Sequence, residues 1–184
     1  EGADPAFHYV HVLLPHTPLA YFPSGQRYGR QRYLPGLEER RDRWTVDEWA
    51  VAQGHQLFLL QVGYVDTVLG QLMSRLKEIG LYDPALVIVT SDHGASFRAG
   101  LPFRGMTDET FMDVLPVPLL IKEPYQQQGA VSDRNMETVD ILPTMSEILG
   151  VSVPWAIDGV SARGIAKPVK RMLFDEARET RTFP

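Results

Sequence analysis

The chain has 184 residues, 44% of them hydrophobic, and a formal net charge of −5. This length is sufficient for one domain with a substantial core, and the composition argues against disorder. A net negative charge gives no broad attraction to nucleic acid or to an anionic membrane surface, so we expect a small-molecule partner and no nucleic acid. The absence of cysteine excludes disulfides, thiolate metal sites and a cysteine nucleophile from this sequence.

We expect no signal peptide in the first residues of this sequence. Residues 1–6 have neither a charged leader nor an apolar segment, so we expect a cloning remnant there and a single domain over residues 7–184. A membrane helix needs about 20 apolar residues, and the apolar stretch 57–60 soon meets Gln61 and Asp66. We therefore expect no membrane span in this sequence.

The first predicted element is a strand. Residues 7–14 combine aromatic and β-branched residues and end at Pro15, where a hydrogen-bonded ladder must stop. A loop punctuated by proline and glycine follows over residues 16–43. Its charged run, residues 38–43, is most simply a solvated surface.

A long amphipathic helix is predicted next. Thr45 and Glu48 have the spacing of a capping box, and Gly80 is placed to end the helix. Apolar residues recur at helical spacing at Val62, Val65, Leu69, Leu72, Leu76 and Ile79.

The following segments predict an α/β fold. Residues 85–90 form a strand that is apolar on both faces, and such strands are typical of a parallel sheet covered on both sides. A second strand is predicted at 117–122, a helix at 139–149 closed by Gly150, and a last strand at 169–174. We therefore expect a mostly parallel central sheet.

Candidate chemistry is concentrated where the strand 85–90 ends. Asp92 offers a carboxylate oxygen and His93 an imidazole nitrogen, a pair of donors that suits a divalent metal ion. Open α/β sheets bind ligands beyond the carboxyl ends of their strands, which is where these residues stand. A simpler interpretation is that Asp92 caps a turn and His93 is a loop residue.

Several segments resemble the alkaline phosphatase and sulfatase superfamily. Residues 86–94 resemble its apolar strand and metal-binding turn, Thr-Ser-Asp-His-Gly, and residues 8–18 resemble the sulfatase strand that ends in Pro-His-x-Pro. Further similar segments follow in the family order at 64–69, 76–83, 117–122, 139–144, 148–150 and 158–159. The resemblance covers roughly residues 7–161.

The resemblance implies a fold and a set of site residues. The fold would be an alkaline phosphatase-like three-layer sandwich, incomplete here. Asp92 and His93 would bind a divalent metal ion, with calcium favoured and manganese or zinc as alternatives. His16 would be catalytic, stabilising or protonating the departing oxygen, while His11 and Arg104 would bind the substrate. In a strand His8 and His11 point to opposite faces, so at most one of them would face a given site.

Two departures from the family pattern limit what the resemblance implies. The strand that supplies acidic metal ligands and the nucleophile is missing, so we expect a fragment of the catalytic domain that is inactive alone. Many sulfatases have a lysine aimed at the sulfate, but residues 91–116 contain none, and Arg98 and Arg104 are the cations there. The ester could thus carry sulfate or phosphate.

Three functions stay open at this point. The expected one is metal-dependent hydrolysis of sulfate or phosphate esters, and a phosphoryl-type transferase is an alternative within the superfamily. A non-catalytic member that binds an anion or a protein would also lack the nucleophile. Relatives commonly act outside the cytoplasm or at a membrane, which is our expectation for location. Exposed sheet edges and apolar surface predict self-association of the fragment.

Overall fold

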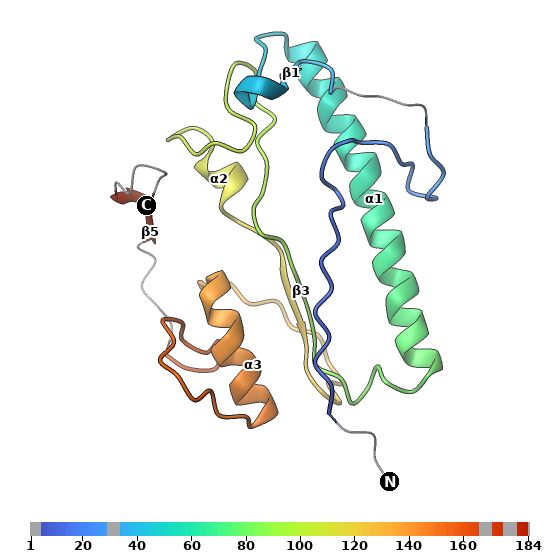
Figure 1. Cartoon of the computed structure of the whole chain (residues 1–184), viewed down its shortest axis with the longest axis vertical. Coiled ribbons are helices and arrows are strands. Elements are labelled where there is room, and N and C mark those ends of the chain that lie inside the picture. Colours follow the sequence, from blue (N-terminus) through green and yellow to red (C-terminus); the bar gives the residue numbers. More distant parts are fainter. Residues whose placement is uncertain (1–4, 29–33, 166–170, 175–179, 184) are drawn as a thin grey trace. The chain divides into compact units, whose positions relative to one another are not determined.

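The computed structural model describes residues 5–28, 34–165, 171–174 and 180–183 (Figure 1). The chain divides into two compact units. Unit one comprises the residues up to Arg75 together with Ala95–Gly105, and unit two comprises Leu76–Gly94 and the residues from Met106 onward.

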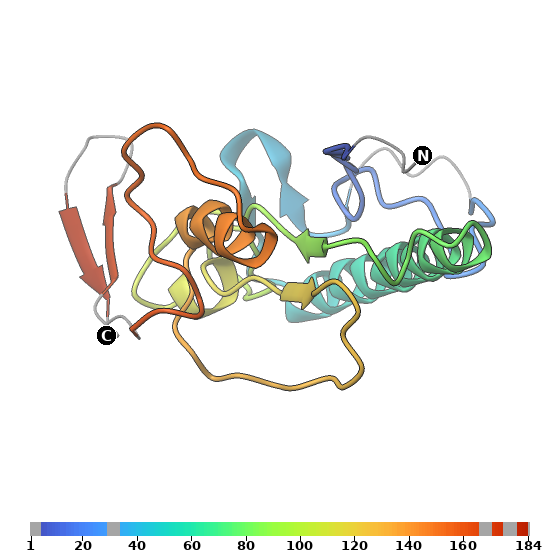
Figure 2. The same ribbon diagram turned by 90° about the horizontal axis from the view of Figure 1, so that it is seen from below.

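The longest element is the helix α1, Glu48–Glu78, which Figure 2 shows as one uninterrupted helix. The predicted helix is therefore confirmed, but its predicted capping box is wrong. Asp47 Oδ1 accepts hydrogen bonds from the backbone N–H groups of Trp49 (3.0 Å) and Ala50 (3.2 Å). A cap must stand directly before the first turn to reach these amides, and Asp47 holds that place instead of Thr45.

Gly80 ends α1, as expected. Its φ of +71° is the left-handed conformation of a helix C-cap, and the N–H groups of Leu81 and Tyr82 both donate to Leu76 O. By length and composition α1 could cross a membrane, which our reading of the sequence did not expect. A single helix of this length and composition is weak evidence for a membrane protein.

The core of unit one is built around Trp44, which is 1% exposed. Its indole Nε1 donates a hydrogen bond to Ser96 O at 2.7 Å, and its ring packs edge-on against Phe103. A Cβ at Gly54 of α1 would lie 2.7 Å from the Trp44 ring, so glycine there permits the close packing. The other buried members of the cluster are Leu19, Leu34 and Val51.

The charged run 38–43 is largely exposed, as expected, and it folds into a tight antiparallel hairpin. Strands β1 (Leu37–Glu38) and β2 (Arg43–Trp44) pair, with the short 3₁₀ helix η1 (Glu39–Arg41) between them. Asp42 adopts a left-handed conformation (φ 49°, ψ 40°) where the chain turns back into β2.

Unit two contains the strands β3 (Val87–Thr90) and β4 (Leu119–Lys122), which confirm two predicted strands in shortened form. They pair antiparallel, with Ile88 opposite Ile121, so the expected parallel direction is wrong for this pair. A strand that is apolar on both faces indicates cover on both sides but does not fix the direction of its neighbour. The connection between them contains only the short helix α2 (Phe111–Val114).

The predicted helix 139–149 is confirmed as η2 (Thr138–Asp140) followed by α3 (Ile141–Leu149). Gly150 caps α3 in the left-handed conformation, with φ +65°. Strand β5 (Arg171–Phe174) confirms most of the last predicted strand, whose residues 169–170 lie outside the described part. It pairs antiparallel with β6 (Thr180–Phe183), which the sequence did not lead us to expect.

Residues 7–14 form no strand in the structure, so that prediction is wrong. Phe7 is 74% and Tyr9 78% exposed. β-branched and aromatic residues favour a strand only where a neighbour offers a ladder to pair with. The described residues form three separate two-stranded antiparallel sheets, so they do not confirm a three-layer sandwich with a mostly parallel sheet.

Candidate active site

The Asp92-His93 pair lies in unit two, two residues beyond the end of β3, as the sequence predicts. Both residues are exposed. The His93 N–H donates to Asp92 Oδ1 at 3.0 Å, and the Ser91 hydroxyl donates to His93 O at 3.0 Å. These bonds fix the turn, and they are also what the simpler interpretation of Asp92 as a turn cap requires.

The hydrogen bonding of His93 determines its tautomer. Nδ1 lies 2.8 Å from Gly94 O, and a carbonyl oxygen only accepts, so Nδ1 carries the proton. In the neutral ring the lone pair is then on Nε2, which faces Asp92 Oδ2 at 3.8 Å. Metal-binding histidines commonly donate their other N–H to a carbonyl in this way.

The two donor atoms fit a divalent ion in type and roughly in spacing. Ligands of a tetrahedral zinc ion, with bonds of about 2.1 Å, stand about 3.4 Å apart. A complete site needs at least one more ligand, and no group of three or more potential metal-binding side chains occurs in the part of the chain that the structure describes. Asp92 and His93 are therefore two donors of suitable type, which do not make a metal site by themselves.

The pKa of Asp92 lies below its ordinary value. Burial acts in the opposite direction, but it is outweighed by the hydrogen bond from the His93 N–H, the charge of His93, the backbone of Asp92 itself and the Ser91 hydroxyl. These hydrogen bonds therefore favour the anionic form of Asp92.

Gly94 is required by a close approach of the backbone. Its N–H donates to Val114 O at 2.7 Å, and a Cβ at this position would lie 2.3 Å from Asp113 O. Only glycine fits without moving the segment that contains α2. This contact, rather than a special turn conformation, explains the glycine of the motif.

His16 lies in a loop of unit one and is exposed. Its Nδ1 lies 2.8 Å from Thr17 O and must therefore carry a proton. Its Nε2 accepts a hydrogen bond from Arg104 Nη1 at 3.4 Å. The structure thus brings two predicted site residues together, with His16 as a neutral ring whose Nε2 lone pair faces a guanidinium.

Arg104 is held by Asp42, which the reading of the sequence missed. Asp42 Oδ1 accepts from Arg104 Nε and forms an ion pair with Nη2, both at 3.1 Å, while Oδ2 accepts from the Arg104 backbone N–H at 3.1 Å. Asp42 is separated from Arg104 by 62 residues, so no local pattern could have linked them.

The remaining predicted substrate-binding residue, His11, is exposed, and its ring makes no hydrogen bond to any other residue that the structure describes. His11, His16 and Arg104 belong to unit one, and Asp92 and His93 to unit two. The structure thus forms two separate pairs, His16 with Arg104 and Asp92 with His93.

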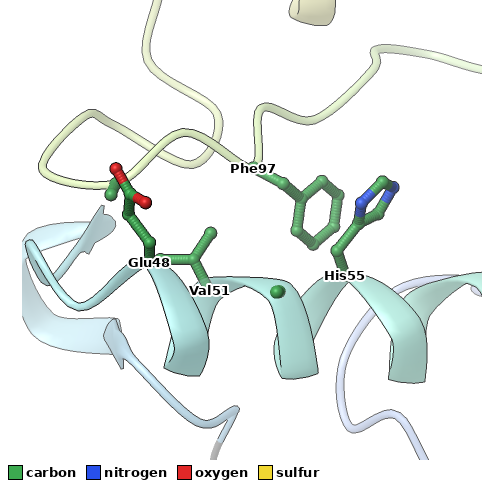
Figure 3. Close-up of a pocket in the computed structure, with 6 residues that line it drawn as sticks. Glu48, Val51, His55 and Phe97 are labelled. Atoms are coloured by element: carbon green, nitrogen blue, oxygen red, sulfur yellow. The ribbon is translucent and has the colours of Figure 1, made fainter.

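A cavity of about 320 Å³ lies elsewhere in unit one (Figure 3). Its lining includes Glu48, Val51 and the His55 ring, which stacks on Phe97 with ring centroids 4.5 Å apart. None of the predicted site residues lines it, so the cavity and the candidate chemistry do not coincide.

Comparison with known proteins identifies the class. The structure resembles the phosphonate monoester hydrolase SpPMH from Silicibacter pomeroyi with a TM-score of 0.56 and 32% identity, over 62% of this chain and 22% of that one. The fold of the matched part is thus that of the alkaline phosphatase and sulfatase superfamily.

The sequence model of the sulfatase family matches residues 1–151, and the chain belongs to this family. Among curated relatives, the multifunctional alkaline phosphatase superfamily protein PehA from Trinickia caryophylli is 33% identical over 121 residues, which are 64% of this chain and 23% of that protein. Arylsulfatase K from Xenopus laevis is 35% identical over 96 residues, 52% of this chain and 18% of the enzyme. The chain therefore spans about a quarter or less of the length of these relatives, and the resemblance seen in the sequence is confirmed.

Proposed function

We propose that the complete protein is a metal-dependent hydrolase of sulfate or phosphorus esters. The family match over residues 1–151, which includes the Asp92-His93 turn, is the observation that supports this most. The three-layer α/β sandwich expected from the sequence would then be the fold of the complete domain, to which this chain contributes β3, β4 and the flanking helices.

In this proposal Asp92 and His93 hold a divalent cation, with calcium preferred over manganese or zinc. Asp92 is anionic and His93 presents a Nε2 lone pair, so both are in the protonation state that a metal ligand needs. The ion would supply electrostatic stabilisation of the charge that develops on the ester oxygens.

Arg104 would bind the anionic ester group. Asp42 Oδ1 contacts Nε and Nη2 of Arg104, and these two contacts fix the plane of the guanidinium. The guanidinium has further N–H groups that can donate to an anion. The arginine side chain is 42% exposed, so an anion can reach it. Arg104 would then serve where many sulfatases use a lysine, and His11 would contribute a further donor.

His16 would act on the departing oxygen. With Nδ1–H committed to Thr17 O, any proton exchanged with a ligand has to pass through Nε2. In the structure Nε2 accepts a hydrogen bond from Arg104 Nη1. Binding of an anionic ester to Arg104 would turn the Arg104 N–H groups toward the ester and leave Nε2 free for the proton that the leaving oxygen needs.

A phosphorus ester is the second candidate substrate, because a similar solved structure is a phosphonate monoester hydrolase and because residues 91–116 contain arginines but not the lysine that many sulfatases aim at the sulfate. Location outside the cytoplasm or at a membrane, and self-association of the isolated chain, stay predictions.

The test is a substrate panel with the complete natural polypeptide that contains this sequence. Aryl sulfate, aryl phosphate and phenyl phosphonate esters would be compared in calcium, manganese and zinc, with Arg104→Lys as a variant. Faster sulfate hydrolysis would support a sulfatase, and a phosphonate preference would support the second candidate. No hydrolysis of any ester in any metal would favour a binding protein and overturn the proposal.

A further inference from the structure

The amide of Gln61 makes an unusual set of contacts in the middle of α1. Gln61 is 0% exposed and lies on the same face of the helix as Val51 and Gly54, the other buried residues of α1. An apolar side chain is the normal occupant of such a position, because a buried amide costs free energy unless all its polar atoms are paired.

All the hydrogen bonds of this amide go to the segment that contains His16. Oε1 accepts from the Ala20 N–H at 2.8 Å, and Nε2 donates to His16 O at 2.8 Å and to Pro15 O at 3.2 Å. Both N–H groups are thus used, and the partners fix which end of the amide is oxygen and which is nitrogen.

Few other hydrogen bonds hold the backbone of residues 13–20 in place. Residues 13–20 belong to no helix or strand, so no regular ladder orders them. The backbone N–H of His16 donates to Leu13 O at 2.8 Å, and the ring bonds to Thr17 O and Arg104. The only bond to His16 that comes from a regular element in the described part of the chain is the one from Gln61.

We propose that Gln61 is a positioning residue that sets the backbone of Pro15 and His16, and thereby the direction of the His16 ring toward Arg104. Gln61 touches no substrate in this proposal and acts through His16. The inference rests on the proposed function only in taking His16 as an active-site residue.

The test compares Gln61→Met with Thr67→Val. Methionine keeps the volume but makes none of the three hydrogen bonds. Thr67, on the same helix, donates to Pro23 O at 2.8 Å, so its valine variant also removes a bond from α1 to the loop, but one that does not reach His16. Gln61→Glu is a further variant: in its protonated form it keeps an acceptor for Ala20 and one donor for His16.

The readout is the ¹⁵N NMR signature of the His16 ring in the complete natural polypeptide, assigned with His16→Gln, together with the pH profile of kcat. Wild type and Thr67→Val should show one tautomer with the proton on Nδ1. Gln61→Met should show mixed tautomers, a shifted pH profile and at least a tenfold lower kcat with little change in KM, and Gln61→Glu should lie between.

The proposal is overturned if Gln61→Met, or Gln61→Glu where the methionine variant does not fold, keeps the wild-type tautomer and pH profile while losing only stability. The NMR signature does not depend on turnover. A protein that hydrolyses none of the esters would therefore refute the proposed function and still give a result for Gln61.

Discussion

Asp42 and Arg104, 62 residues apart in the chain, are joined by three hydrogen-bonding contacts of 3.1 Å each, two to the guanidinium and one to the backbone N–H of the arginine. This arrangement orients Arg104 toward His16. Backbone contacts bring Asp42 beside Arg104: Asp42 O accepts from the Phe103 N–H at 2.7 Å, and Arg43 forms an antiparallel bridge with Pro102.

Asp42→Asn is expected to raise KM for the ester more than it lowers stability. Asparagine tolerates the left-handed conformation and can still accept from the Arg104 N–H, but it loses the ion pair. The two side chains are 33% and 42% exposed, so the ion pair contributes at most about 1 kcal/mol. If all of this free energy is lost from ester binding, KM rises about fivefold. Steady-state kinetics would measure it.

The matched control for Asp42 is Glu38→Gln, which removes the neighbouring exposed pair with Arg41 at 3.2 Å. That pair touches no predicted site residue, so KM should not change. Equal effects of the two variants on KM would show that Asp42 does not act through Arg104.

Gly94→Ala should destabilise the protein. A Cβ at Gly94 would lie 2.3 Å from the backbone oxygen of Asp113, so the segment leading into β4 has to move. Overpacking of this kind costs about 1–3 kcal/mol. Urea unfolding followed by circular dichroism would measure the change.

Gly70→Ala is the matched control and should change stability in the opposite direction. Gly70 is an exposed residue of α1 with no atom within 4 Å of a Cβ, so alanine should stabilise the helix by about 0.5–1 kcal/mol. If both alanine variants were neutral, the close approach at Gly94 would not exist in solution.

Asp140 should prove structural. It is 1% exposed, and its carboxylate accepts from the N–H groups of Glu137 (2.9 Å) and Val160 (2.7 Å). In Asp140→Asn one acceptor becomes an N–H that faces another N–H, which should lower the free energy of unfolding by about 1–3 kcal/mol. Asp66→Asn, at an exposed site of α1, should change it by less than about 0.5 kcal/mol.

Asp92 should contribute slightly to the pH dependence of stability. Its folded pKa lies below the unfolded value, so the contribution is present above the ordinary aspartate pKa and is lost as the pH falls through the lower folded pKa. The carboxylate is largely exposed, so the effect is small. Carboxyl ¹³C NMR titration of Asp92 should give an inflection below the ordinary aspartate range, and an inflection at or above that range would contradict the assigned hydrogen bonds.

Helices and their ends could be predicted from the sequence better than the pairing of strands. The period of the apolar residues predicted α1, and Gly80 and Gly150 predicted helix ends that the structure confirms. Strand direction and pairing failed at residues 7–14 and at β3 with β4, because a ladder depends on a neighbour that the local sequence does not specify.

In the candidate site, too, contacts between neighbours in the sequence could be predicted and long-range contacts could not. Asp92 and His93 are adjacent in the chain, so their proximity needed only the motif. His16 and Arg104 were proposed separately from resemblance and charge, and their contact is long-range. Asp42 and Gln61 were missed, because an aspartate in a charged run and a glutamine in a helix look like ordinary surface residues until burial and partners are known.

The central claim, that Asp92 and His93 hold a metal ion in an ester hydrolase, is tested most directly by hydrolysis of aryl sulfate and phenyl phosphonate before and after removal of metal by a chelator. The complete natural polypeptide should lose activity on chelation and regain it with calcium, or with manganese or zinc. Asp92→Asn and His93→Gln should stay inactive in every metal while keeping the wild-type fold by circular dichroism. Hydrolysis that survives chelation, or full activity in Asp92→Asn, would contradict the account.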